Sequence, residues 1–342
     1  MTHAHTDTGN PIAYEPQSNE DEPARMWPLL AKIAVSVAVL GWIGYNTDLI
    51  AVAGVMAAAD PGYLAISVGW FAVLLIVQAG RWGLVLTALG VALPLTLRVR
   101  SFYIGQFFNQ TLPSTIGGDA MRIWMLRDKV SLRDAAHGVL CDRLVALFSM
   151  LLLSVAGLPW LAELDNDGRA VISVSAAFAA GFIAMLGIAC LDLLPGPLAR
   201  HKWLTPARAL SVDLRRVLLN IHPGPAVVLI SVLVHANAAV VVWWLALGLD
   251  AHVTLWQCLV LVPPIMVVSA IPISVAGWGV REGAMVAAFS LTGMPAETAF
   301  ATSLLFGLTL VAIGLPGGIL WLLERGATAP PRSDLPPPRS SI

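Results

Sequence analysis

Two arginines, Arg122 and Arg281, are suited to bind the same kind of group, because each follows the same interruption of an apolar segment. In both stretches, 113–122 and 272–281, a proline comes first, a glycine follows five residues later and the arginine nine residues later. The planar guanidinium group grips phosphate through two parallel hydrogen bonds. Glycine-rich turns expose backbone N–H groups, and the start of the following helix adds a positive dipole end. If the two stretches converge near the membrane midplane, they predict an anion site for phosphate or a phospholipid headgroup.

Charged side chains inside membrane segments are costly, so those near the two interruptions are functional candidates. The candidates for binding the substrate headgroup are Arg122, Arg281, Asn109, Gly117, Gly118, Gly277 and Gly279. The prolines that would allow the breaks to act as gates are Pro113 and Pro272. The candidates for balancing charge or coupling protons are Asp119, Asp142, Arg143, Glu282 and Arg81.

Each arginine has a purely structural alternative, in which it pairs with an acid and holds a turn. Arg122 would then pair with Asp119 or Asp142, and Arg281 would pair with its neighbour Glu282. Both alternatives remain open at the level of sequence.

The remaining polar residues of the apolar segments have ordinary explanations too. Arg81, with Gln78 three residues before it, could extend to the cytoplasmic surface rather than face a site. His235 could be a core residue with a satisfied ring or could couple protons, and Asn109 could cap broken backbone instead of binding a ligand.

The composition identifies a polytopic membrane protein. Of the 342 residues, 57% are hydrophobic and 12% are charged, whereas a soluble domain carries roughly a quarter charged residues. The formal net charge of -1 gives no information about partners. We expect no binding to nucleic acid.

Six apolar runs are long enough to span about 30 Å of hydrocarbon, which takes roughly 20 helical residues. They cover approximately 27–46, 63–88, 137–160, 169–194, 225–248 and 298–323. Two further segments, 99–127 and 255–293, are apolar but interrupted by proline and glycine. Backbone groups freed by such residues must be buried in protein or line a wet cavity, so we expect re-entrant or broken helices.

The placement of lysine and arginine predicts the orientation. These residues are frequent between spans two and three and between spans four and five, and absent from loops 47–62, 161–168 and 249–254. Basic loops face the cytoplasm. We therefore expect a multi-pass protein of the bacterial inner (plasma) membrane with both termini in the cytoplasm.

The order of segments then repeats upside down. Each half, about 27–160 and 169–323, reads as span, span, broken segment, span, and the two prolines are about half a chain apart. Paired Pro/Gly interruptions in two halves of a transporter point to a substrate site. The fold class predicted is all-α, with six full spans, two broken segments and two inverted halves, although eight full spans are an alternative.

The segments outside the spans are polar. We expect residues 1–26 to form a disordered cytoplasmic tail rather than a signal peptide, and 326–342, rich in proline, to be disordered too. The transmembrane domain is then 27–325. The basic segment 198–220 is either a helix on anionic headgroups or an ordinary cytoplasmic loop.

Motifs of soluble enzymes are missing. The sequence has no Walker A loop, no HExxH, no GxSxG and no CxxC. Its three cysteines, Cys141, Cys190 and Cys258, fall in apolar segments without metal-ligand spacing, which indicates small core residues. We therefore expect no enzymatic activity, no cofactor and no metal.

Three motifs together resemble one family. The run from Gly105 to Arg122, the triplet Cys141-Asp142-Arg143 and the run from Pro272 to Gly283 are similar to the signature of the lysylphosphatidylglycerol synthase transmembrane region, also called flippase-like domain proteins. The pair Arg81-Trp82 resembles its pattern as well. The resemblance covers about 27–323.

The resemblance implies a stand-alone lipid-translocating module without the lysyltransferase domain of the full-length synthases. It implies an anionic-headgroup lipid or a polyprenyl-phosphate-linked sugar as the substrate, and enzymes of glycolipid or polysaccharide synthesis as possible partners. Trp278 departs from the family pattern, which often has a small or aliphatic residue there. A small-anion or ion-coupled transporter, and an accessory subunit or transferase of glycolipid synthesis, are the alternatives.

Overall fold

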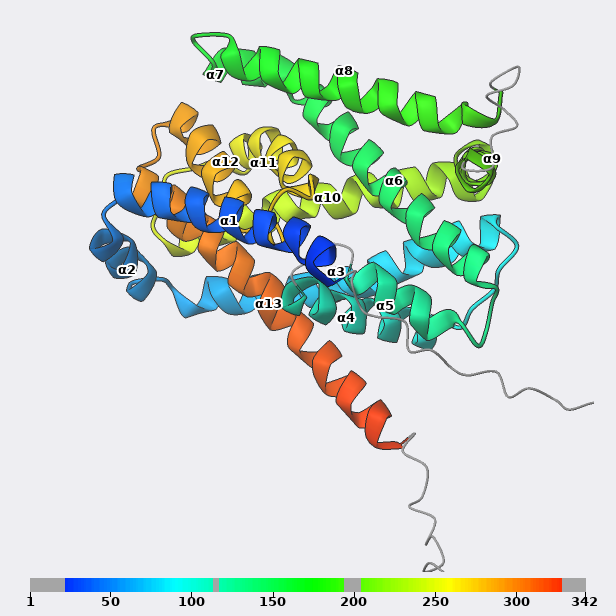
Figure 1. Ribbon diagram of the computed structural model, residues 1–342. Coiled ribbons are helices and arrows are strands. Elements are labelled where there is room, and N and C mark those ends of the chain that lie inside the picture. Colours follow the sequence, from blue (N-terminus) through cyan, green and yellow to red (C-terminus); the bar gives the residue numbers. More distant parts are fainter. Residues whose placement is uncertain (1–21, 113–116, 194–203, 328–342) are drawn as a thin grey trace, which may run out of the picture.

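The computed structural model describes residues 22–112, 117–193 and 204–327, and these form helices joined by turns (Figure 1). The all-α membrane fold predicted from composition is therefore confirmed. Most of the two predicted tails, and Pro113 with the three residues after it, lie outside the described residues.

Five helices are long and apolar enough to cross a membrane, and they match five of the six predicted spans. They are α3 (Pro61–Ala88), α6 (Leu132–Ala156), α8 (Arg169–Ala189), α10 (Pro223–Gly248) and α13 (Ala296–Ala327). Side-chain caps mark the starts of two of them, Asp60 for α3 and Ser131 for α6. Ser131, for example, accepts a hydrogen bond from the backbone N–H of Asp134 and caps α6.

The first span differs from its prediction. Helix α1 (Glu22–Asn46) is followed by α2 (Leu49–Ala57), and the apolar parts of the two helices meet at 90°. A loop was predicted over 47–62, but the apolar residues after Asp48 continue as helix because its side chain accepts from the N–H groups of Ile50 and Ala51. Counted as one bent span, the pair raises the number of candidate spans among the described residues from five to six.

Both interrupted segments are broken helices. The first forms α4 (Leu95–Thr111) and α5 (Gly117–Leu126), and the second forms α11 (Leu255–Ala270) and α12 (Val280–Phe289). The arms contain 17, 10, 16 and 10 residues. Each arm is shorter than the roughly 20 residues that a full crossing needs, so the eight-span alternative has no support.

Two short helices lie where connections were predicted. Predicted span 137–160 ends at Ala156, and α7 (Leu158–Leu164) follows at once because Gly157 and Pro159 interrupt the helix. Helix α9 (Thr205–Leu219) forms from the basic segment 198–220, which favours the helical alternative there. Its inner face buries Ser211, Leu214 and Val217.

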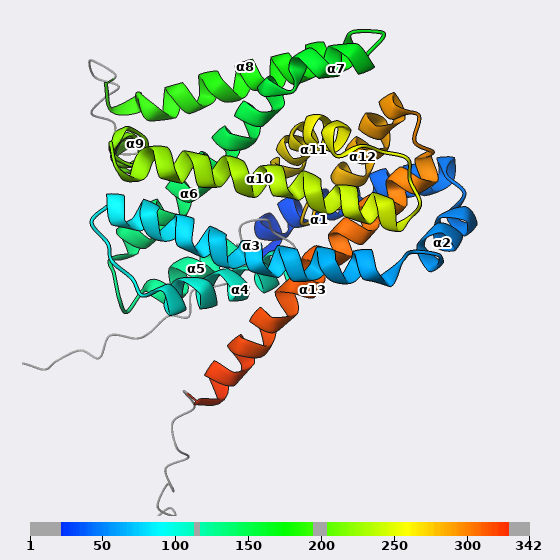
Figure 2. The same cartoon turned by 180° about the vertical axis from the view of Figure 1, so that it is seen from behind.

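The halves repeat one packing scheme, α1 to α6 and then α8 to α13. Helix α4 packs along α13 and α11 packs along α6, while α3 contacts α4 and α10 contacts α11. Helices α3 and α10 lie side by side and run in opposite directions (Figures 1 and 2). This is the packing that an inverted repeat produces.

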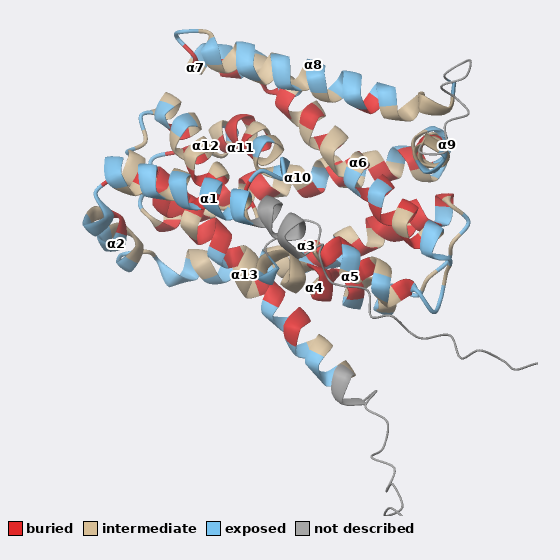
Figure 3. Cartoon of the chain, in the orientation of Figure 1, coloured by how far each residue is buried: buried red, intermediate tan, exposed pale blue. Residues whose placement is uncertain are grey.

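The repeat is not exact at its outer helices. Helix α1 packs on α12, whereas its counterpart α8 packs on α6 and α9. Only 6% of the most apolar 18-residue stretch of α8 is buried. Figure 3 shows α8 as mostly exposed along its length. Helix α8 therefore stands apart from the second broken helix.

The crossing of α13 over α4 depends on a glycine. A Cβ atom on Gly317 would lie 1.9 Å from the carbonyl oxygen of Tyr103. We expect Gly317→Ala to reduce the free energy of unfolding by about 1–3 kcal/mol, because the backbones must move apart. Thermal unfolding in detergent measures this. Gly187→Ala on α8, where nothing lies within 4 Å of the added atom, is the control, and an equal melting temperature for both variants would contradict the close crossing.

The end of α8 is joined to α9 by a charged pair. Asp192, in a short 3-10 turn (Leu191–Leu193), accepts from both terminal nitrogens of Arg215 at 2.5 Å and from the Ser211 hydroxyl at 2.8 Å. The hydrogen bonds from Arg215 and then from Ser211 hold the pKa of the Asp192 carboxyl well below its usual range.

This pKa shift predicts a pH dependence. A carboxyl whose pKa is lower in the folded state stabilises the fold above its unfolded pKa of about 3.9 and loses that effect as the pH falls toward its folded pKa. We expect Asp192→Asn to melt at a lower temperature than the parent at pH 7, with the difference narrowing below about pH 4. A difference that stays constant from pH 7 to pH 3 would show that the charged pair is not its cause.

Candidate functional site

Asn109 and Gly118 close the first break. The Asn109 Oδ1 atom accepts a hydrogen bond of 3.0 Å from the backbone N–H of Gly118, so it satisfies a donor at the start of α5. A Cβ atom on Gly118 would lie 2.1 Å from the carbonyl oxygen of Gly105, so only glycine allows α4 and α5 to approach this closely. The capping contact proposed as an alternative for Asn109 is therefore present. Gly117 begins α5 beside Leu112.

Helix α5 places Arg122 in the interior. Its guanidinium group lies over the rings of Trp82 and Phe102, with centroid distances of 4.2 and 4.0 Å. One terminal nitrogen lies 3.4 Å from Asp119 Oδ1 and the other lies 3.3 Å from Asp142 Oδ2. The side chain is only 5% exposed, and its Nε atom has no hydrogen-bond partner among the described residues.

Two more arginines share the same carboxylates. Arg81 lies 2.8 Å from Asp142 Oδ1 and donates to the Ser231 hydroxyl at 2.5 Å. Its side chain is 3% exposed, so the alternative in which it extends to the surface is wrong. Arg143, half exposed, donates from Nε to Asp119 Oδ2 at 2.7 Å.

The cluster is electrostatically unbalanced. Three guanidinium groups (Arg81, Arg122, Arg143) face two carboxylates (Asp119, Asp142), which leaves one net positive charge when all five groups are ionised. An uncompensated charge is costly in a membrane interior unless a counter-ion or water reaches it. The arrangement therefore suits an anion.

A cavity of about 140 Å³ lies in this cluster. Its polar lining residues are Gln78, Arg81, Gln106, Asn109, Arg122, Asp142, Arg143 and His235. A water molecule needs only about 10–15 Å³ of such space, so a group of several heavy atoms fits. The Nδ1 atom of His235 lies 2.6 Å from the carbonyl oxygen of Ser231, so it carries the proton of that hydrogen bond.

Seven of these eight polar lining residues were singled out from the sequence, five of them as site candidates, and Gln106 was overlooked. It lies three residues before Asn109 on α4, as Gln78 lies three residues before Arg81 on α3, and residues at that spacing share a helix face. The sequence signal that could have identified Gln106 is a side-chain amide one helical turn before a candidate residue, which also occurs at Gln78 before Arg81.

The second break is held by α1 and by its own helix. Ala276, Gly277 and Gly279 have φ values of 49°, 81° and 89°, a left-handed conformation that favours glycine. The Ser36 hydroxyl of α1 accepts from the N–H of Val275 at 2.9 Å. Glu282 Oε2 accepts from the N–H of Gly279 at 2.5 Å and caps α12.

Arg281 forms a closed cluster of its own. It donates to Glu282 Oε1 at 2.5 Å and to the Ser303 hydroxyl at 3.3 Å, and its guanidinium lies 4.7 Å from the Trp278 ring centroid. A Cβ atom on Gly307 would lie 2.3 Å from its Nη2 atom, so space there is filled. The side chains of Arg281 and Glu282 are 3% and 0% exposed.

The two arginines therefore belong to separate clusters, and Arg281 does not line the Arg122 cavity. The repeated spacing had predicted that both would converge on one anion site. The pairing of Arg281 with Glu282 is the contact of the structural alternative, and Pro272 lies in the turn before it.

Asp142 bridges Arg81 and Arg122, which makes it the most consequential acid of the first cluster. We expect Asp142→Asn to lower the free energy of unfolding by about 3–5 kcal/mol, because two buried arginines lose a partner. Thermal unfolding in detergent measures the loss.

Asp128→Asn is the matched control for this variant. Asp128 pairs with Arg127, but its side chain is 76% exposed, so a change below about 1 kcal/mol is expected. If both variants melted at the same temperature, the Asp142 bridge would not stabilise the fold.

These observations define a polytopic helical membrane protein with two inverted halves and one unbalanced cationic cavity at a helix break. The sequence matches the family described as the lysylphosphatidylglycerol synthase TM region over residues 29–318, and the chain belongs to that family. No curated protein sequence matches the chain. Membership confirms the resemblance and supports a flippase-like role in lipid handling.

Proposed function

We propose that this protein moves a lipid with an anionic headgroup between the leaflets of the inner membrane, with both termini in the cytoplasm. The substrate classes that fit are a phospholipid, an aminoacylated lipid and a polyprenyl-phosphate-linked sugar. In this proposal the protein catalyses no reaction and needs no cofactor, and its partners are the bilayer and the enzymes that make or use the lipid.

The observation that carries the proposal is the net positive charge of the Arg122 cluster. Arg122 and Arg81 are nearly fully buried, and the Nε atom of each has no partner among the described residues. Guanidinium groups form strong, bidentate hydrogen bonds with phosphate as they do with carboxylates. A phosphate in the cavity would neutralise the excess charge and supply the missing acceptors in one step.

The neutral lining of the cavity supports a headgroup with hydroxyl groups. Gln78, Gln106 and Asn109 add side-chain amides to the lining of the cavity, and amides both donate and accept hydrogen bonds. A glycerol or sugar hydroxyl beside the phosphate would match them. The bilayer meets the hydrocarbon part of the lipid, so the cavity needs to hold only the polar part.

The second break has a different part in this proposal. Arg281 is already balanced by Glu282, so its excess charge is zero and its affinity for phosphate is lower than that of Arg122. We assign Gly277, Gly279 and Pro272 to a gate that changes shape as the headgroup passes, and Arg281 and Glu282 to holding that gate. Asp119, Asp142 and Arg143 would adjust the charge of the cavity during passage.

A second candidate function is transport of a small anion. The cavity of about 140 Å³ also has room for an inorganic anion. The same cluster would bind phosphate or a carboxylate without a hydrocarbon chain. An accessory role in glycolipid synthesis is the third possibility, and within residues 22–112, 117–193 and 204–327 no group of three or more potential metal ligands supports a catalytic version of it.

The proposal predicts that lipid movement depends on Arg122. Proteoliposomes would contain the purified protein and headgroup-labelled phosphatidylglycerol, lysylphosphatidylglycerol or a polyprenyl-phosphate sugar. We expect Arg122→Gln to slow the movement of one lipid class at least tenfold, since losing one charge-assisted contact of about 1.4 kcal/mol already gives that factor.

Two variants control this experiment. Arg127→Gln removes an exposed arginine at the cytoplasmic end of α5 and should transport normally. Arg281→Lys keeps the charge of the second cluster and should retain the preference among lipids. Equal rates for Arg122→Gln and the parent, from correctly folded protein, would exclude the headgroup assignment, and uptake of phosphate without movement of any lipid would favour the small-anion transporter.

A further inference from the structure

His235 is the one titratable residue lining the Arg122 cavity that the proposed function does not use. It lies on α10, and it lines the cavity together with residues of α3, α4, α5 and α6. Its Nδ1 atom donates to the carbonyl oxygen of Ser231 at 2.6 Å. A carbonyl oxygen only accepts, so one ring proton stays on Nδ1, and the Nε2 atom of the neutral ring has a free lone pair. Nε2 makes no hydrogen bond with a described residue.

The charged groups around His235 come from other helices. Arg81 of α3 donates to the hydroxyl of Ser231, the same residue whose carbonyl oxygen accepts from the ring. His235 and Arg81 are therefore close neighbours in one hydrogen-bonded network. The other charged residues that line the cavity are Arg122 of α5 and Asp142 and Arg143 of α6.

The remaining helices packed on α10 add no charge to the cavity lining. Helix α11 carries no charged residue. The charged residues of α13 lie near its two ends, and those of α9 pair with one another or bind Asp192. These residues are Glu297, Glu324 and Arg325 on α13 and Arg208, Asp213, Arg215 and Arg216 on α9.

Without a bound anion the ring of His235 stays neutral. The three guanidinium groups and two carboxylates of the cluster already have one net positive charge, and a second one inside a membrane is costly. Asp119 and Asp142 each pair with two arginines, so protonating either acid would cost ion pairs. His235 is thus the lining residue that can take up a proton without losing a partner.

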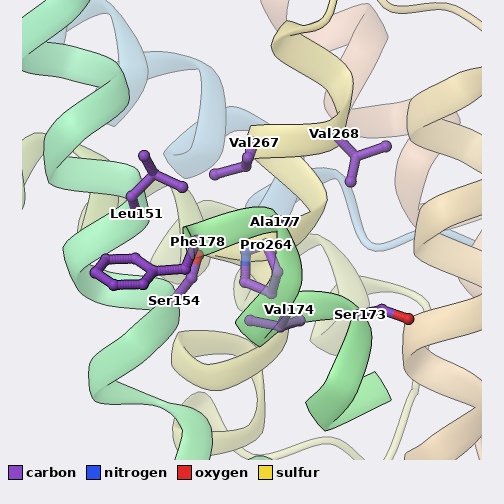
Figure 4. Close-up of a pocket in the computed structure, with 9 residues that line it drawn as sticks. All are labelled: Leu151, Ser154, Ser173, Val174, Ala177, Phe178, Pro264, Val267 and Val268. Carbon is purple, nitrogen blue, oxygen red and sulfur yellow. The ribbon is translucent and has the colours of Figure 1, made fainter. Parts of the chain in front are cut away.

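The spaces beside α8 lack this combination of groups. A recess of about 90 Å³ between α6, α8 and α11 is lined by apolar side chains and by Ser154 and Ser173, as Figure 4 shows. Both hydroxyls donate to carbonyl oxygens of their own helices. An adjoining space of about 550 Å³ has one arginine, Arg169, with Asp165 and Asp167 in its lining. That lining is net negative and does not suit an anion.

A phosphate with two negative charges changes the balance in the Arg122 cavity. A terminal phosphate, meaning a phosphate monoester or inorganic phosphate, carries one or two negative charges near neutral pH, because its second pKa is about 6. Two charges balance the cluster only when the His235 ring is protonated as well. A phosphodiester carries one charge, which balances the cluster with the ring neutral, and it has no P–OH group to donate to Nε2.

We infer that His235 is the proton-accepting residue of the Arg122 cavity, so that the cavity binds a terminal phosphate together with one proton. The O–H bond of the P–OH group breaks, its proton forms the N–H bond at Nε2, and this N–H then donates to the same phosphate oxygen. The proton leaves with the phosphate. This inference rests on the function proposed for the Arg122 cavity and names the class of headgroup that it selects.

Calorimetric titration at several pH values tests the proton uptake. The full chain would be held in phosphatidylcholine nanodiscs and titrated with inorganic phosphate, short-chain phosphatidic acid or short-chain phosphatidylglycerol. Above about pH 7 the complex holds one proton more than its free partners, so raising the pH opposes binding. We expect the affinity for both terminal phosphates to fall about tenfold per pH unit, and that for the diester phosphatidylglycerol to stay within about twofold.

The comparison between the two terminal phosphates identifies the source of the ligand. Tighter binding of phosphatidic acid would indicate a lipid headgroup, and equal binding would indicate free phosphate.

Histidine variants test the residue. His235→Gln keeps a polar side chain but takes up no proton, so we expect it to weaken both terminal phosphates about tenfold or more at pH 7 and to leave phosphatidylglycerol within about twofold. His252→Gln changes an exposed histidine in the connection after α10 and should leave the affinity for all three probes unchanged. His235→Asn is the second variant, so the test stands if His235→Gln fails to fold.

Nuclear magnetic resonance of ¹⁵N-labelled histidine rings locates the proton. The signal of His235 Nε2, assigned by its absence from the variant spectrum, should move from the position of an unprotonated to that of a protonated nitrogen when inorganic phosphate is added. Phosphatidylglycerol should not move it. A histidine that only packs against its neighbours would give no such difference.

Two results would overturn this inference alone. They are pH-independent binding of the terminal phosphates, and pH-dependent binding in which the His235 ring stays unprotonated. Phosphatidylglycerol binding that Arg122→Gln abolishes would in either case still support the anion site. If no probe bound in a manner that depends on Arg122, the proposed function and this inference would both be wrong.

Discussion

The structure depends on one constraint, which is that backbone groups released where helices break inside a membrane must find partners within the protein. At the first break the Asn109 side chain accepts from the N–H of Gly118. At the second, Ser36 of α1 and Glu282 of α12 accept from the N–H groups of Val275 and Gly279. The Asn109 contact holds α4 against α5, the Ser36 contact brings α1 over the second break, and Glu282 caps its own helix.

The same requirement explains why the charges are distributed unequally. Glu282 both caps α12 and neutralises Arg281, so the charge at the second break is balanced within α12 itself. The cap of the first break is a neutral amide, so Arg122 must find its partners elsewhere, in Asp119 and in Asp142 of α6. Asp142 also forms an ion pair with Arg81, and Asp119 with Arg143. An inverted repeat has thus become asymmetric in charge, with the excess positive charge in one half.

A second asymmetry has a packing origin. Helix α1 covers the second break because Ser36 binds its backbone and Gly279 allows a close approach, at 3.1 Å between an added Cβ and the Ser36 carbonyl oxygen. Helix α8, the counterpart of α1, is held at its two ends by Asp165 and by the pair of Asp192 with Arg215. Between these ends small residues face α11 and α12, so a groove remains. The polar cavity is lined mainly by the first half, with His235 of α10 from the second, whereas the space beside α8 is lined mainly by the second half.

The sequence alone determined the elements and the membrane environment of this protein. Runs of about 20 apolar residues can satisfy their backbone only as helices in lipid, and Pro and Gly mark where those helices must break, so spans such as 225–248 and both breaks followed from local pattern. The repeated spacing also singled out Arg122 and Arg281. Only the tertiary structure decided which side chains meet. Pattern gives no distance between α3, α6 and α10, so it could not reveal that Arg81 is buried against Asp142. It named the pairing of Arg281 with its neighbour Glu282 as one of two alternatives, and only the packing around that pair decided between them.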